Sequence, residues 1–142
     1  MTHYLIYCCK NGKKIYRNGY LLNGNIVGDF NGKIEKMIYL KDYAKYASYP
    51  LSFNDILTKS CLTENQIKDY GKERNLFALH IKDLNVFRSP LGLAFRAPQN
   101  MCYLGWNGQM CVLISIRPEW VEKIISGDKT IEIRSKVIKG CL

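Results

Sequence analysis

Short runs of β-branched and aromatic residues, separated by Gly, Asn and Pro, fill the first third of the chain. Residues 4–9 and 25–30 are rich in strand-forming side chains, and each run ends at a turn signal. Asn31-Gly32 then has the sequence of a two-residue hairpin turn, which requires positive φ. Polar and apolar residues alternate after this pair, so residues 33–40 are predicted to form the returning strand.

Tyrosine and lysine are interspersed in the segment that follows. Its members are Tyr43, Tyr46 and Tyr49, with Lys41 and Lys45 between them. On a helix, this spacing is typical of a face packed on the core. If the rings are exposed, they would instead form a platform on which unpaired bases stack. Both interpretations stay open, and Pro50 interrupts any helix there.

A helix is predicted from Thr63 to Tyr70, because Thr63-Glu-Asn-Gln66 has the form of a capping box. Gly71 is the expected stop. Just before this helix, residues 52–57 have the sequence for one or two further helical turns.

The rest of the chain predicts more strands and one more helix. The strands are residues 76–81, 84–87, 101–104, 112–116 and 131–134, with Lys82-Asp83 joining the first two. Pro118 suits the first turn of a helix that ends at Gly127. Its apolar face consists of Trp120, Val121, Ile124 and Ile125. Six or seven short strands with two or three helices predict a small α+β barrel.

Composition adds a preference for an anionic partner. The chain has 142 residues, which is one domain's worth of sequence and enough to bury a core. Lys and Arg number 21 against 12 Asp and Glu, and the net charge of +9 favours a polyanion such as nucleic acid. The six cysteines lack zinc-ligand spacing, so we expect reduced thiols, no metal or other cofactor, and a cytoplasmic location. No apolar stretch is long enough to cross a bilayer, so we expect no membrane partner.

A short charged motif near the C-terminus carries a family resemblance. Gly127-Asp-Lys129, Glu132 and Arg134 fit the pattern Gly-x-Lys-x-x-Glu-x-Arg at every fixed position. Ser115-Ile-Arg-Pro118 and a helix containing Trp120 precede it. This segment resembles the opening of the ASCH domain, a small RNA-associated barrel of the PUA-like superfamily, in its phage and bacterial type.

The order of segments differs from that of the family. Residues 111–134 resemble the family's N-terminal segment, residues 1–104 resemble the remainder, and residues 105–110 would join the two. The resemblance therefore implies one circularly permuted PUA-like β-barrel over residues 1–142. A domain swap or a rearranged chain would give the same order of segments and stays an alternative.

The resemblance also implies a basic cleft that binds RNA. Its expected members are Ser115, Arg117, Lys129, Glu132 and Arg134, with Arg96 and Gln99 at the mouth. Lys129 follows a Gly-Asp turn, so we expect its ammonium group to lean over the cleft. Two or three cations around one carboxylate suit a phosphate or a polar base edge. A salt-bridged rim without a ligand is the alternative.

Three functions fit these residues. The first is an RNA-binding module, and the second is a metal-independent ribonuclease with Lys129 and Glu132 as catalytic groups. The third is a phage-type interaction protein that inhibits a host nucleoprotein complex. In the amidohydrolase branch of the family a threonine stands where this chain has Glu132, so that activity is not expected. His80 lies in an apolar strand and is expected to line the core or the barrel.

Overall fold

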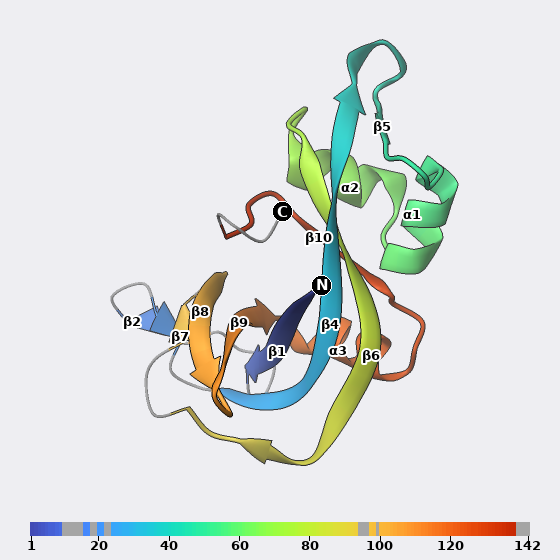
Figure 1. The fold of residues 1–142 in the computed structure, drawn as a ribbon. Helices are drawn as coiled ribbons and strands as arrows, with labels where there is room; N and C mark the ends of the chain where they lie inside the picture. Colours follow the sequence, from blue (N-terminus) through green and yellow to red (C-terminus); the bar gives the residue numbers. More distant parts are fainter. Residues whose placement is uncertain (10–15, 18–19, 22–23, 94–96, 99, 139–142) are drawn as a thin grey trace.

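The computed structural model describes residues 1–9, 16–17, 20–21, 24–93, 97–98 and 100–138 (Figure 1). In this part of the chain, seven strands form one sheet in the order β10-β6-β4-β1-β9-β8, with β5 paired to β4 outside that path. The strands are β1 (Thr2–Cys9), β4 (Gly24–Leu40), β5 (Lys45–Ala47), β6 (Leu76–Leu91), β8 (Met101–Trp106), β9 (Gln109–Ile116) and β10 (Ile131–Arg134). A smaller sheet has the order β2-β3-β7, from β2 (Tyr16–Arg17), β3 (Tyr20–Leu21) and β7 (Ala97–Pro98).

Strand β1 lies in the middle of the large sheet, between partners that are far apart in the chain. It pairs antiparallel with β4 and parallel with β9, where Tyr4 lies opposite Val112. β9 pairs in turn with β8 through a tight hairpin. The tail of the chain thus supplies a strand next to its first strand, as a permuted barrel would require. Its equivalence to the family's opening segment stays a prediction.

The large sheet curls into a half-barrel, which agrees with the predicted α+β class at this coarser level. The bend follows the two longest strands, β4 and β6, as Figure 1 shows. Their pairing shifts register twice, between Ile26 and Gly28 and between Asp29 and Asn31. Such bulges increase twist and let a long strand bend without losing its partner.

The predicted hairpin turn at Asn31-Gly32 is wrong, because both residues lie inside the continuous strand β4. Gly32 serves close packing there: a Cβ atom at this position would lie 2.6 Å from the Tyr4 ring and 2.7 Å from Leu79. The two-residue turn is formed instead by Asn107 and Gly108, whose φ angles of 48° and 77° are both positive.

 Asn-Gly is a local turn signal, and the long pairing of β4 with β1 and β6 overrides it at residues 31–32.

The two strands predicted around Lys82-Asp83 are in fact the single strand β6. Asp83 has φ of 53° at the point where the register with β4 shifts, so it forms a bulge and not a turn. Its carboxylate accepts a hydrogen bond of 3.1 Å from the Asn31 side chain on β4. This cross-strand bond holds the bulge against the neighbouring strand.

The predicted helices are confirmed, and so is the capping box at Thr63. The predicted stop at Gly71 is wrong by one residue, because Gly71 is the last helical residue and Lys72 is the C-cap. The helices are α1 (Phe53–Ser60), α2 (Glu64–Gly71) and α3 (Pro118–Ile125), and a 3-10 turn, η2, covers Lys41–Tyr43. Ser52 and Thr63 each cap a helix through a reciprocal capping box. Pro118 occupies the first turn of α3, where its missing N–H leaves no hydrogen bond unmade.

The three spaced tyrosines do not share a helix face. Tyr46 lies on β5 and is buried, whereas Tyr43 and Tyr49 are 74% and 91% exposed. The apolar face predicted for α3 is confirmed in part. Val121 and Ile124 are buried, but Ile125 is 45% exposed.

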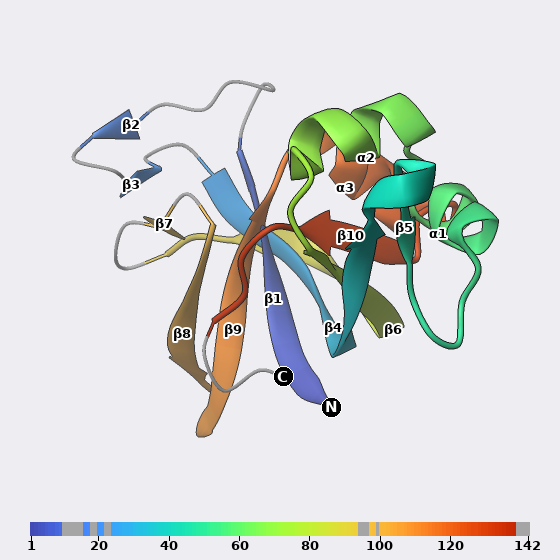
Figure 2. The same ribbon diagram turned by 90° about the horizontal axis from the view of Figure 1, so that it is seen from above.

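The two faces of the curled sheet carry separate parts of the core. One cluster fills the inside of the curl, from Tyr4 and Phe30 to Val121 and Ile124 of α3. The residues under α1, α2 and β5 form another cluster, and it contains Ile131 of β10. In the view of Figure 2 the helices gather on one side of the molecule and β8 and β9 lie on the other. Within the described residues, no helix is long and apolar enough to cross a membrane.

Candidate functional site

A pocket of about 600 Å³ opens between α2, α3, the end of β9 and β10. Its lining residues are Leu62, Gln66, Tyr70, Asn100, Ser115, Arg117, Trp120, Lys129, Glu132, Ile133, Arg134, Ser135 and Lys136. These residues come from four distant parts of the chain. The fold therefore assembles the pocket only when the tail is packed on the body.

The pocket contains each described residue that the sequence nominated for the cleft. Ser115, Arg117, Lys129, Glu132 and Arg134 all line it. The other two nominated residues, Arg96 and Gln99, lie outside the described residues. The structure thus brings the five residues into one place, while their role in binding stays a prediction.

Lys129 is buried, and this differs from the expected ammonium group leaning over an open cleft. Its side chain is 1% exposed. Nζ donates a 2.7 Å hydrogen bond to the carbonyl oxygen of Ser60 and lies 3.4 Å from Oε1 of Glu132. The ring of Trp120 covers the ammonium group, with 5.0 Å from Nζ to the ring centroid. Lys129 is therefore a fixed part of the pocket wall.

Burial lowers the pKa of Lys129, because removal from water disfavours the charged ammonium group. The nearby carboxylate of Glu132 opposes this shift, and the more distant charge of Arg134 adds to it. The net direction is downward. A larger share of neutral amine is therefore present at alkaline pH than for an exposed lysine.

Glu132 lies between the two buried cations. Its Oε1 faces Lys129, and its Oε2 accepts a 3.1 Å hydrogen bond from Arg134. The Glu132 side chain is only 9% exposed. Charged groups this deep need partners, so each member of the cluster requires the others.

Arg134 also fastens the two ends of the curled sheet together. Its Nη1 donates a 2.7 Å hydrogen bond to Oδ1 of Asn100, and its Nη2 donates one of 2.6 Å to the carbonyl oxygen of Ser115. Asn100 immediately precedes β8, and Ser115 lies on β9, whereas Arg134 ends β10. One guanidinium group thus bridges the seam of the half-barrel next to the pocket.

The pocket wall also contains polar groups that sequence reasoning missed. The Tyr70 hydroxyl accepts a 2.9 Å hydrogen bond from the backbone N–H of Ser135, which ties α2 to the end of β10. Lys136, which no sequence pattern singled out, is an exposed pocket residue like the predicted Arg117, so both charges face solvent. The α2 residues stand about sixty positions before β10 in the chain, and no local pattern indicates that they meet it.

His80 is not part of the pocket. It lies on β6, opposite Ile131, on the face that α1 and α2 cover, and its side chain is 22% exposed. Burial lowers the pKa of His80, and the charges of Lys59, Lys82 and Lys33 lower it further. The interpretation as a partly buried structural histidine is consistent with this position.

The described residues contain no group of three or more His, Cys, Asp or Glu side chains that could hold a metal ion. The described lining of the pocket combines four cationic side chains with one carboxylate and two aromatic rings, a set that suits an anion or a polar group. No family model matches this chain, and neither the curated proteins nor the solved structures contain a match to it.

Proposed function

We propose that the chain is an RNA-binding module that holds one nucleotide of a single strand in the pocket beside Arg117. The observation that carries this proposal is the lining of the pocket. Four cationic side chains, Arg117, Lys129, Arg134 and Lys136, line the pocket, whereas Glu132 is the single carboxylate among the described lining residues. An excess of positive charge at a concave site attracts a phosphate group.

The size and shape of the pocket support one nucleotide and not a duplex. Its volume of about 600 Å³ falls within the range of about 300–1,000 Å³ that is usual for small-molecule pockets. Trp120 and Tyr70 supply aromatic surface in the lining, and unpaired bases stack on such rings. The preference for RNA over DNA rests on the family resemblance.

The interior and the mouth of the pocket have different roles in this proposal. Lys129, Glu132 and Arg134 are already bonded to one another or to backbone carbonyls, so they shape the wall. Arg117 and Lys136 are exposed and can form new bonds to a phosphate. A Lys129→Ala variant would therefore test the integrity of the wall more than binding, and Arg117 is the better probe.

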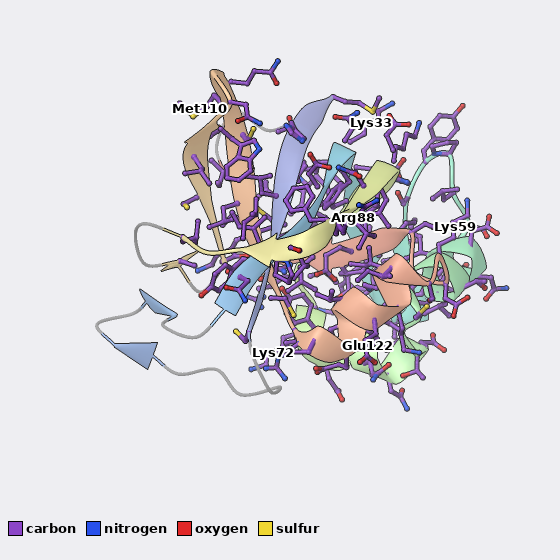
Figure 3. The ribbon with its side chains drawn as sticks, turned by 90° about the horizontal axis from the view of Figure 1, so that it is seen from below. Lys33, Lys59, Lys72, Arg88, Met110 and Glu122 are labelled. Carbon is purple, nitrogen blue, oxygen red and sulfur yellow. The ribbon has the colours of Figure 1, made fainter. Side chains whose placement is uncertain are left out.

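Arg117→Ala is expected to weaken the binding of a labelled single-stranded RNA in a fluorescence anisotropy titration. Loss of one phosphate contact should also make the slope of the logarithm of the binding constant against the logarithm of the salt concentration less steep by about 1. Arg88→Ala is the matched control, because Arg88 is an exposed arginine on β6 outside the pocket lining (Figure 3). Equal losses in the two variants would show that net charge alone governs binding and would contradict the proposal.

A ribonuclease is the second candidate, and the lowered pKa of Lys129 favours it. In this scheme the Trp120 ring moves aside and the neutral amine of Lys129 takes the proton of an attacking 2′-OH. The bond from phosphorus to the 5′-oxygen breaks, and Arg134 stabilises the charge that develops on the phosphorus oxygens. Because Lys129 would act as a base, cleavage should accelerate as pH rises through its lowered pKa. General-base help of this kind contributes about 10²–10⁴-fold.

Cleavage of RNA in the presence of a chelator checks this second candidate. Lys129→Arg keeps a positive charge but cannot act as a base, so it should abolish the activity and its rise with pH. The Arg88→Ala variant should retain both. Cleavage that persists in Lys129→Arg would exclude Lys129 as the base.

A further inference from the structure

A second chemical cluster lies outside the pocket, on three adjacent strands. His3 of β1, Asp29 of β4 and Cys111 of β9 occupy the same face of the sheet. Asp29 pairs with Leu5, two residues from His3, and the parallel register of Tyr4 with Val112 places His3 beside Cys111. Because alternate residues of a strand share a face, the three side chains meet there.

The distances define a connected series of hydrogen bonds. Cys111 Sγ lies 3.2 Å from Nδ1 of His3, and Nε2 of His3 lies 2.9 Å from Oδ2 of Asp29. An ionised carboxylate only accepts, so Nε2 carries a proton and donates it to Asp29. In the neutral ring, Nδ1 then carries a lone pair, and this lone pair accepts a hydrogen bond from the Cys111 thiol. The imidazole is thus held in the tautomer that can remove the thiol proton.

We propose that Cys111 is a base-assisted thiol whose reaction partner is a small oxidant of the peroxide class. The thiol proton passes to Nδ1 of His3, and sulfur attacks one oxygen of hydrogen peroxide. The O–O bond breaks, a sulfenic acid forms on Cys111, and the leaving hydroxide takes the proton from His3 to give water. Sulfur is oxidised and peroxide is reduced, so the step needs no further reactant.

The burial of Cys111 limits the size of the oxidant that can react with it. Cys111 is fully buried, whereas the side chains of His3 and Asp29 are 27% and 19% exposed, so the ring lies between the thiol and solvent. Met110, the next residue, is 68% exposed and projects at the end of the β8–β9 hairpin (Figure 3). The thiol is therefore one side chain below the surface, and a small oxidant reaches the sulfur only when the partly exposed His3 ring shifts, an opening too small for a polymer.

The same burial explains why the base is needed. Burial raises the pKa of the Cys111 thiol, and the negative charge of Asp29 raises it further. At neutral pH the unassisted thiol therefore stays protonated and unreactive. The groups that face it are His3 from β1 and Asp29 from β4, and His3 is the one that can take its proton.

Peroxide treatment followed by dimedone trapping and peptide mass spectrometry tests the proposal on the intact protein. Cys102 is the internal control, because it is more exposed than Cys111 but only burial shifts its pKa. Cys111 should be labelled at least about tenfold faster than Cys102, a modest part of what general-base assistance supplies. His3→Gln should remove this advantage and leave the Cys102 rate unchanged. Labelling of Cys111 no faster than Cys102 in the unaltered protein would overturn the proposal.

The pH profile provides a second measurement that needs no variant. With His3 as the base, proton transfer inside the pair supplies the thiolate, so the labelling rate of Cys111 should rise by much less than tenfold for each pH unit across the alkaline range. A lone thiol with a raised pKa would instead accelerate about tenfold for each pH unit across the same range. A continuous rise of that size would exclude assistance by His3, whatever the folding of the His3→Gln variant.

Discussion

Replacing Glu132 with glutamine is expected to lower the free energy of unfolding by about 3–5 kcal/mol, the usual cost of leaving a buried charge without its partner. Glu132 supplies the carboxylate that separates Lys129 from Arg134, at 3.4 Å and 3.1 Å respectively. Lys129 is 1% exposed and Arg134 is 13% exposed, so water cannot replace the lost charge. Two like charges would then face each other inside the protein.

Urea unfolding monitored by tryptophan fluorescence measures this change in the free energy of unfolding. The urea concentration at the midpoint should fall, while the dependence of the free energy on urea concentration stays the same. Glu122→Gln is the control, because Glu122 is exposed on α3. The substitution makes the same chemical change at the protein surface. Exposed charges of this kind contribute about 0–1 kcal/mol. A Glu132→Gln variant as stable as the Glu122→Gln control would show that the buried cluster is not held by Glu132.

The same variant should respond to pH in a defined direction. The pKa of Lys129 is lowered in the folded state from its ordinary 10.5, so between the two values the unfolded chain binds more protons and stability rises with pH. Loss of Glu132 removes the group that opposes this lowering. The deficit of Glu132→Gln should therefore shrink as pH rises and Lys129 loses its proton. A deficit that grows towards alkaline pH would contradict this assignment.

The second large effect is expected at Tyr4, where truncation to alanine should cost about 3–5 kcal/mol, as for other buried aromatic residues. The Tyr4 side chain is fully buried and stacks on Phe30, with ring centroids 5.1 Å apart and planes 5° from parallel. It also lies over Gly32, where an added Cβ would come within 2.6 Å of the ring. Tyr4 and Leu79, which an added Cβ would approach to 2.7 Å, together account for the glycine at position 32.

A double-mutant cycle tests that link. Gly32→Ala alone should cost about 1–3 kcal/mol through overpacking, and much of that cost should disappear in the Tyr4→Ala background. Gly108→Ala is the matched control, since Gly108 has φ of 77° and nothing lies within 4 Å of its added Cβ. Its cost arises from backbone strain and should be the same in both backgrounds. If the cost of Gly32→Ala is the same in both backgrounds, the Leu79 side chain and not the Tyr4 ring demands glycine at position 32.

Local signals in the sequence predicted the helices well, because their causes lie within a few residues. The capping box at Thr63 and the proline at position 118 satisfy or remove backbone donors at the helix start, whatever surrounds them. Asn-Gly is a weaker signal, because its turn must compete with pairing on both sides. At Asn107-Gly108 the turn prevails, and at Asn31-Gly32 the sheet prevails.

The sequence could predict only those pocket residues that belong to the charged motif or to the segment just before it. Lys129, Glu132 and Arg134 are close in sequence, so their meeting follows from one turn and one strand. The burial of Lys129 could not be predicted, because it depends on the Ser60 carbonyl at the end of α1. His3 and Cys111 are 108 positions apart, and only the parallel register of β1 and β9 brings them together.

That parallel register also sets the order of events during synthesis. β1 is made first, but the strand that covers its second edge, β9, ends at Ile116. At a translation rate of about 5–20 residues per second, roughly 100 residues of delay leave that edge without a partner for about 5–20 seconds. An apolar strand with open backbone donors and acceptors is prone to pair with other chains. Pairing across so long a separation also makes folding slow, so this edge of β1 stays open to other chains until β9 has been made, even if β4 already covers the opposite edge.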